Sequence, residues 1–166
     1  MKKIFYLFIA ISIYACGNSP IELPTKSNQD DFGKQVIKSI KSNDSTDYKK
    51  LFIDKPGFKE IIKTSSLSKE AKAEENKKID YKLKQVIKSI QPSFIKLKKS
   101  LANAGIDSKK IKFSKLEANS FQKNGMTSAQ ITIYFTFEDV EYKLYSSKTL
   151  LTKSGWKISA PFYFQG

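Results

Sequence analysis

The side chains that most often carry out chemistry are scarce in this sequence, which has one cysteine, Cys16, and no histidine. A cysteine nucleophile usually needs a neighbouring base such as histidine to activate its thiol. Zinc sites need several cysteine and histidine ligands at short spacing, and no calcium-loop pattern of alternating Asp and Asn is present. We therefore expect no catalytic centre, no metal site and no cofactor.

Adjacent carboxylates occur at three places, Asp30-Asp31, Glu74-Glu75 and Glu138-Asp139. A catalytic carboxylate pair must converge on one reacting group. Neighbouring residues of a helix or a strand point in different directions. We interpret all three pairs as solvated surface and expect that the protein is not an enzyme. An enzyme that uses carboxylates and tyrosines alone is a third hypothesis, behind the two binding functions described below.

The first fifteen residues have the pattern of a secretory leader. Lys2 and Lys3 precede an uncharged run, residues 4–15. A transmembrane helix needs about 20 apolar residues, and this run is much shorter. We expect residues 1–15 to be a signal peptide.

The junction Ile13-Tyr14-Ala15-Cys16 has an aliphatic residue three positions before the cysteine and a small residue directly before it. It resembles the lipobox of bacterial lipoproteins. The resemblance implies that Cys16 is modified with diacylglycerol and acylated, for example with palmitate, and becomes the first mature residue. Two or three acyl chains hold a protein stably on a membrane. The alternative is an ordinary signal peptide that leaves Cys16 as a lone thiol.

The residues after Cys16 are mostly polar and include Pro20 and Pro24, the composition of an extended tether. In lipoprotein sorting, an aspartate after the modified cysteine favours the inner membrane. This chain has Gly17 and Asn18, so the resemblance implies the cell outer membrane or the cell surface. We expect a tether over residues 16–28, one folded domain over residues 29–162 and a tail over residues 163–166.

The chain is strongly basic, with a formal net charge of +14, and lysine supplies all 30 positive charges. Lysines concentrate before residue 116, in the half where helices are expected. This excess of lysine favours binding to anionic lipid or polysaccharide. The alternative is that the lysines only solvate helix faces in a lysine-rich protein. We expect no nucleic-acid partner, because the chain carries an export signal and lacks the arginine that reads guanine and pairs with phosphate in a bidentate manner.

Hydrophobic periodicity divides the domain into two halves. Apolar residues at helical spacing predict a helix that starts near Ser27 and a short second helix with Tyr48, Leu51 and Phe52. A further apolar stretch contains Phe58, Ile61 and Ile62, and a longer helical region runs from Lys69 towards Gly105, with Pro92 interrupting or kinking it. Gly105 is expected at the helix C-terminus. From residue 111 the period changes to two, and turn signals at Asn124-Gly125, Glu138-Asp139 and Ser154-Gly155 separate four strands. We predict an α+β fold, with N-terminal helices packed on a C-terminal four-stranded, curved antiparallel sheet.

Three short segments carry a second resemblance: the helix break at residues 41–44, the exit at residues 105–107, and residues 154–158, which contain a Gly-Trp turn before the last strand. Together with the element order, they resemble the nuclear-transport-factor-like (cystatin-like) domains of many small bacterial lipoproteins. The resemblance covers residues 30–162 and implies a cone-like fold. It implies no activity, because the His or Asp dyad frequent in that family is absent.

A cone of this kind encloses a pocket between its sheet and its helices, and apolar pockets are common ligand sites. The predicted lining residues are Phe135, Phe137, Tyr142, Leu144 and Trp156. The alternative is that these five side chains fill the core. We expect a lipid-anchored, non-catalytic envelope protein that binds a protein or a small apolar ligand. The alternative function is a surface adhesin whose lysine-rich half binds glycosaminoglycan or anionic lipid.

Overall fold

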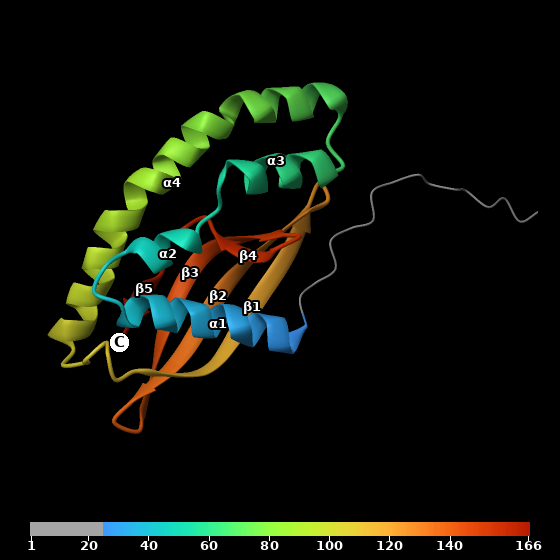
Figure 1. The fold of residues 1–166 in the computed structure, drawn as a ribbon. Coiled ribbons are helices and arrows are strands. Elements are labelled where there is room, and N and C mark those ends of the chain that lie inside the picture. The colour runs from blue at the N-terminus through green and yellow to red at the C-terminus, as the bar shows by residue number, and fades with distance from the viewer. Residues whose placement is uncertain (1–24) are drawn as a thin grey trace, which may run out of the picture.

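The computed structural model describes residues 25–166, so the predicted signal peptide and Cys16 lie outside the described residues. Four helices precede five strands (Figure 1). The helices are α1 (Lys26–Lys41), α2 (Thr46–Lys50), α3 (Lys55–Thr64) and α4 (Lys69–Asn103). The strands are β1 (Lys112–Lys123), β2 (Met126–Phe137), β3 (Val140–Thr152), β4 (Gly155–Ile158) and β5 (Tyr163–Gln165). The predicted α+β class is confirmed.

Helix α1 begins earlier than predicted, inside the segment expected to be tether. Thr25 is its N-cap, and the Thr25 side chain accepts a hydrogen bond from the backbone N–H of Asn28 at 3.3 Å. A threonine caps a helix nearly as well as a serine, so Thr25 rather than Ser27 sets the start. Asp30 consequently lies beyond the first turn, where it pairs with Lys26 at 3.0 Å.

Helix α4 runs through Pro92 as one element, so the predicted alternative of an interruption is wrong, whereas the alternative of a kink stays a prediction. Pro92 is exposed, so the backbone carbonyl that loses its helical partner can bond to water. The helix ends as predicted at Gly105, which has a φ of 74°. The N–H of Ile106 donates to Leu101 O at 2.9 Å and that of Gly105 to Ala102 O at 3.0 Å, which is a Schellman motif.

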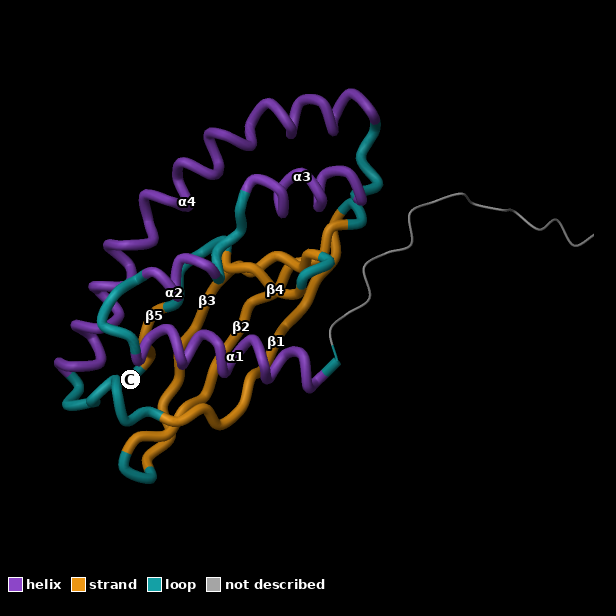
Figure 2. The backbone as a smooth tube through the Cα atoms, viewed as in Figure 1, coloured by secondary structure: helices purple, strands orange, loops and turns teal. Residues whose placement is uncertain are grey.

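The sheet is antiparallel, with strand order β1-β2-β3-β4, and β5 also pairs with β3 (Figure 2). Both long hairpins close with two left-handed residues, Asn124-Gly125 and Glu138-Asp139, as predicted. Next to β4, the segment after α2 continues the sheet through a parallel bridge between Phe52 and Ile158. The N–H of Ile53 donates to Ile158 O at 2.9 Å.

Residues 163–166 were expected to lie outside the domain, but residues 163–165 form β5. Phe162 is buried, and its N–H donates to the Tyr48 hydroxyl at 3.1 Å. The Phe164 ring lies 6.4 Å from that of Phe135 and 6.0 Å from that of Tyr142, between centroids. A three-residue strand is too short to show alternation in a sequence, which explains why the fifth strand was missed.

The sheet is covered on one face along most of its length and on both faces near the β1–β2 turn. Thr127, Ser128 and Ala129 are successive residues of β2, and all three are buried. Because successive strand residues point to opposite faces, both faces are covered there. Farther along β2, Gln130 is exposed while Ile131 and Ile133 are buried.

Helix α1 covers the face of Ile133. Gly33 of α1 lies against the Phe113 ring, and Phe113 is paired in register with Phe135. Phe135 and Ile133 share a face because they are two residues apart on β2. Helices α3 and α4 pack on each other beside the β1–β2 turn, above the sheet in Figure 1.

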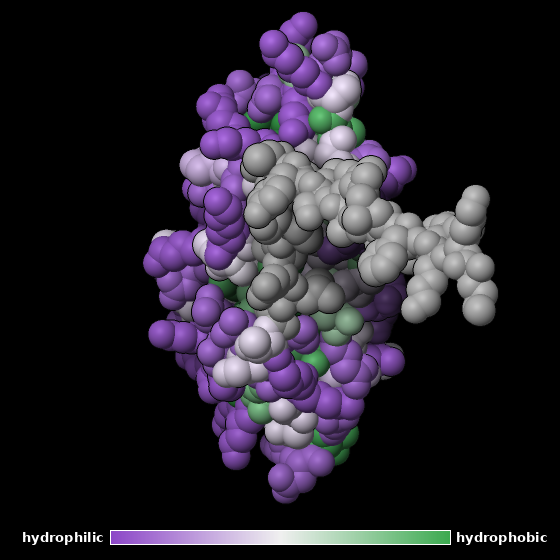
Figure 3. Space-filling view, turned by 90° about the vertical axis from the view of Figure 1, so that its right-hand side faces the viewer, coloured by the Kyte–Doolittle hydropathy of each residue, from purple (hydrophilic) through white to green (hydrophobic). Residues whose placement is uncertain are grey.

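On the side of the molecule that Figure 3 shows, the visible surface of residues 25–166 is mostly hydrophilic. No helix of this part of the chain is long and apolar enough to cross a membrane.

Candidate ligand-binding pocket

The five predicted lining residues do not gather around one cavity. Phe135, Leu144 and Trp156 have exposed fractions of 0%, 0% and 4% and belong to the core. Tyr142 stacks on Phe135, with ring centroids 5.7 Å apart and planes at 24°. Phe137, near the β2–β3 turn, packs against the core from a partly buried position.

Two of the five also border surface depressions, which are separate. Phe137 borders a depression with Lys41, Lys110 and Lys112, whereas Tyr142 borders another with Tyr134. Both depressions are open and carry polar side chains. The alternative in which these residues fill the core therefore agrees better with their positions.

A different pocket has the apolar character expected of a ligand site. It lies between α3, α4 and the part of the sheet next to the β1–β2 turn, and its volume is about 490 Å³. We call it the α3–α4 pocket. Its apolar lining residues are Phe58, Ile61, Ile62, Tyr81, Val86, Phe121, Met126 and Leu150. Pockets for small molecules usually have volumes of about 300–1,000 Å³ and apolar walls.

The sheet supplies the floor of the α3–α4 pocket from a single cross-strand row. Phe121 of β1 is paired in register with Ser128 of β2, which is paired with Leu150 of β3. Residues directly opposite each other on neighbouring strands share a face. This row lies on the face opposite Ile133, and therefore opposite α1, because Ser128 and Ile133 are five positions apart on β2, and residues an odd number of positions apart point to opposite faces.

The helices supply the other walls. Phe58, Ile61 and Ile62 form the apolar stripe of α3 at helical spacing. From α4, Val86 is 8% exposed and Tyr81 is 68% exposed. Phe121 is 49% exposed, so two large aromatic side chains border the pocket while facing water, and such apolar exposure often marks a binding site.

The polar rim contains one acidic residue, Glu75, and two lysines compensate its negative charge. Glu75 forms a short ion pair with Lys82 and lies 3.6 Å from the Lys78 amine. The hydrogen bond from Lys82 lowers the pKa of Glu75, with further help from the Lys78 charge. Glu75 therefore stays ionised, and its ion pair compensates the positive charge of Lys82.

Two other rim lysines, Lys123 and Lys148, form neither an ion pair nor a side-chain hydrogen bond with any residue between 25 and 166. Their backbone positions are fixed. Lys123 precedes the Asn124-Gly125 turn, which is tied to the α3–α4 loop because Ser66 N–H donates to Asn124 O at 2.9 Å. Lys148 lies in a bulge of β3, where its carbonyl accepts from Ser159 N–H at 3.1 Å and Ala160 N–H at 2.8 Å.

Among residues 25–166, no group of three acidic, cysteine or histidine side chains is placed to hold a metal ion. The prediction that all three carboxylate pairs are solvated surface holds only in part. Glu74 pairs with Lys78 at 2.8 Å, Asp31 pairs with Lys34 at 3.1 Å, and Glu138-Asp139 forms a hairpin turn. Asp30, in contrast, is half-buried with a buried Oδ1 atom, and Glu75 lines the α3–α4 pocket.

Comparison with known proteins found no match: no protein-family model, no curated protein and no solved structure matches the chain. The resemblances to bacterial lipoproteins and to nuclear-transport-factor-like domains thus stay predictions.

The α3–α4 pocket was not predicted, because ligand contacts were expected on the opposite face of the sheet. Its α3 wall consists of Phe58, Ile61 and Ile62, which also belong to the buried core. One signal was present. Phe121 lies on the polar side of the alternation in β1, two residues before Lys123 and close to a tight turn. An apolar ring on the polar side of a strand indicates a binding site when it belongs to a larger exposed apolar patch.

Proposed function

We propose that this chain is a lipid-anchored, non-catalytic protein of the bacterial cell envelope whose α+β domain binds a small apolar ligand in the α3–α4 pocket. The observation that carries the binding function is the pocket itself. Its volume of about 490 Å³, its apolar walls and the exposed rings of Tyr81 and Phe121 suit an apolar molecule.

The anchor is supported by the sequence alone. Cys16 follows a short, uncharged run and a small residue, and Gly17 and Asn18 favour the outer membrane or the cell surface over the inner membrane. An acylated Cys16 would keep the domain next to a supply of apolar molecules.

The proposal that the protein is not an enzyme rests on its amino-acid composition and on the ion pairs of Glu75 at the pocket rim. The chain has no histidine. Glu75, the acidic residue of the pocket rim, is engaged by Lys82 and Lys78, so its charge is already compensated.

Ligand binding can be tested with N-phenyl-1-naphthylamine, a neutral apolar dye that fluoresces in apolar sites. Purified full chain should bind the dye saturably. Gln85→Trp places a large side chain at the mouth of the pocket, because Gln85 is exposed and lines it. This variant should lose most of the binding. Ile87→Trp is the matched control, since Ile87 is exposed on the same helix but is not part of the lining. Equal binding by both variants would contradict the pocket assignment.

The anchor has its own test. Wild-type chain and Cys16→Ser are expressed in a bacterium and separated into membrane and soluble fractions. We expect the wild-type protein in the membrane fraction, with an intact mass that reports leader removal and added acyl groups. Membrane association of fully processed Cys16→Ser equal to wild type would contradict lipid anchoring.

A second function, polyanion binding by the helical half, is favoured by one observation. Lys77, Lys84, Lys88 and Lys99 are exposed and fall on one side of α4 at spacings of seven, four and eleven residues. None of the four forms an ion pair or a side-chain hydrogen bond within the described chain. Binding of heparin or anionic vesicles through this row should weaken steeply as salt rises, whereas dye binding in the α3–α4 pocket should barely change.

A further inference from the structure

The rim of the α3–α4 pocket has a charge pattern that specifies the ligand further, and this inference rests on the proposed function. Four charged side chains border the pocket: Glu75, Lys82, Lys123 and Lys148. Glu75 and Lys82 neutralise each other. The uncompensated charge of the rim is therefore positive and comes from Lys123 and Lys148.

These two lysines belong to the sheet side of the pocket. Lys123 is two residues from Phe121 on β1, and Lys148 is two residues from Leu150 on β3. Both side chains are exposed, so an anionic group can reach their amines from solvent while the rest of a ligand lies against Phe121 and Leu150. Backbone hydrogen bonds at Asn124 and Lys148 hold both chain segments in place.

We infer that the α3–α4 pocket takes a single-chain anionic amphiphile, with its acyl chain between α3, α4 and the Phe121–Ser128–Leu150 row. Its head group lies at the rim in the positive field of Lys123 and Lys148, which the strand register places on opposite sides of that row. An apolar wall accounts for the chain, and the unpaired lysines account for the anionic head. A neutral apolar ligand would leave both lysines without a role in binding.

The volume agrees with one acyl chain. A methylene group takes up nearly as much space as one molecule of liquid water, about 30 Å³. A pocket of about 490 Å³ thus has room for one chain of roughly sixteen carbons.

The test compares palmitate with hexadecanol, which has the same chain length and no charge, by displacement of the bound dye from purified full chain. Palmitate should bind more tightly than hexadecanol, by about threefold to tenfold at low salt. The double variant Lys123→Gln/Lys148→Gln should remove that preference and leave hexadecanol binding unchanged. The control Lys84→Gln/Lys88→Gln removes the same charge from α4 outside the pocket and should keep the preference.

The possible outcomes separate this inference from the proposed function. Equal binding of palmitate and hexadecanol, unaffected by the rim variant, would overturn the inference while supporting an apolar pocket. Absence of displacement by either compound, together with dye binding that Gln85→Trp does not affect, would overturn both. A lysophosphatidic acid of the same chain length distinguishes a phosphate head from a carboxylate, and its preference must also depend on Lys123 and Lys148. Binding of either anionic compound that is unaffected by the rim variant would contradict the head-group assignment.

Discussion

The Tyr48 hydroxyl accepts a hydrogen bond from the backbone N–H of Phe162 at 3.1 Å, across 114 positions of the chain. Tyr48 is fully buried, with its ring 5.2 Å from that of Phe52 and 5.4 Å from that of Phe94, between centroids. This contact fastens the segment between β4 and β5 to α2 and α4.

Tyr48→Phe should lower the free energy of unfolding by about 1–3 kcal/mol, because it leaves the buried N–H of Phe162 without its partner. Urea denaturation measures this change. Tyr134→Phe is a control, since Tyr134 donates to Glu117 at the exposed surface of the sheet. A loss no greater than that of Tyr134→Phe would show that the buried hydrogen bond contributes little.

The stability of the protein should depend on Tyr48 at alkaline pH. Burial raises the pKa of Tyr48 to about 12, whereas an unfolded tyrosine has a pKa of about 10. Between these values the unfolded state loses a proton that the folded state keeps, so the contribution is complete below pH 10 and is lost as pH rises to 12. The stability of wild type should fall more steeply than that of Tyr48→Phe over this range. Parallel curves would contradict the buried neutral phenol.

Two glycines with positive φ differ in their surroundings. A side chain at Gly105 would meet no atom within 4 Å, so Gly105→Ala should cost about 1–2 kcal/mol from backbone strain alone. At Gly125 the added Cβ would also lie 3.0 Å from the Ser66 nitrogen. Gly125→Ala should therefore cost more and, because it disturbs the turn after Lys123, should weaken ligand binding. Thermal unfolding and dye titration of both variants check this difference.

The contact between α1 and β1 leaves no room at Gly33, where an added Cβ would overlap the Phe113 ring. Gly33→Ala should lower the free energy of unfolding by about 1–3 kcal/mol through overpacking. A smaller side chain at the partner position, Phe113→Leu, should recover part of this loss in the double variant. Strictly additive losses would show that the two residues do not compete for the same space.

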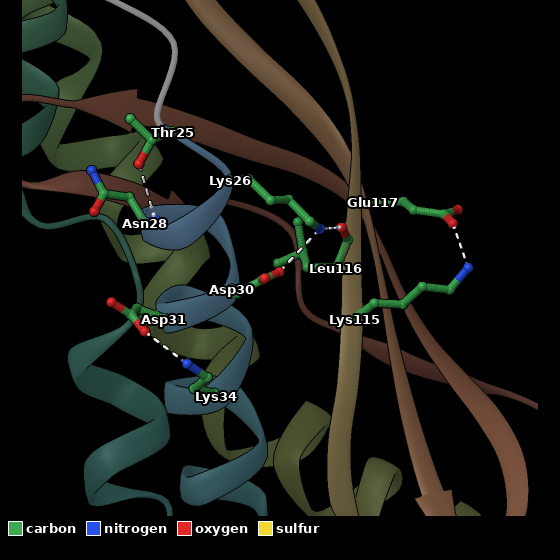
Figure 4. Close-up of polar contacts among 9 residues, drawn as sticks. All are labelled: Thr25, Lys26, Asn28, Asp30, Asp31, Lys34, Lys115, Leu116 and Glu117. Carbon is green, nitrogen blue, oxygen red and sulfur yellow. Dashed lines mark hydrogen bonds and ion pairs between the residues drawn. The ribbon is translucent and has the colours of Figure 1, made fainter.

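The first turn of α1 is attached to β1 by another long-range contact (Figure 4). The Lys26 amine donates to the Leu116 carbonyl at 2.6 Å and pairs with Asp30. Lys26→Met should lower the free energy of unfolding by about 1–3 kcal/mol, because it leaves the buried Oδ1 atom of Asp30 without its cation. Chemical denaturation measures the loss, and a loss below about 0.5 kcal/mol would show that the contact does not stabilise the helix start.

The class of the fold was predictable because its signals are local. The stripes of α1 and α3, the alternation of β2 and the Asn124-Gly125 turn each occupy a few consecutive residues. The α3–α4 pocket was not predictable in the same way. It depends on which face of the sheet α3 and α4 cover, and that choice follows from long-range packing around Phe121 and Leu150. Strand β5 was missed because three residues are too few to show alternation, and its position depends on the long-range contact between Phe162 and Tyr48.

A titration of ¹⁵N-labelled full chain with N-phenyl-1-naphthylamine, followed by backbone NMR, shows directly where the protein binds an apolar ligand. We expect the largest shifts at Ile61, Val86, Phe121 and Ser128, on both sides of the α3–α4 pocket. Residues beside Phe137 and Tyr142 should shift little. Shifts centred on Phe137 or Tyr142, or spread evenly over the domain, would contradict a ligand site between α3, α4 and the β1–β2 turn.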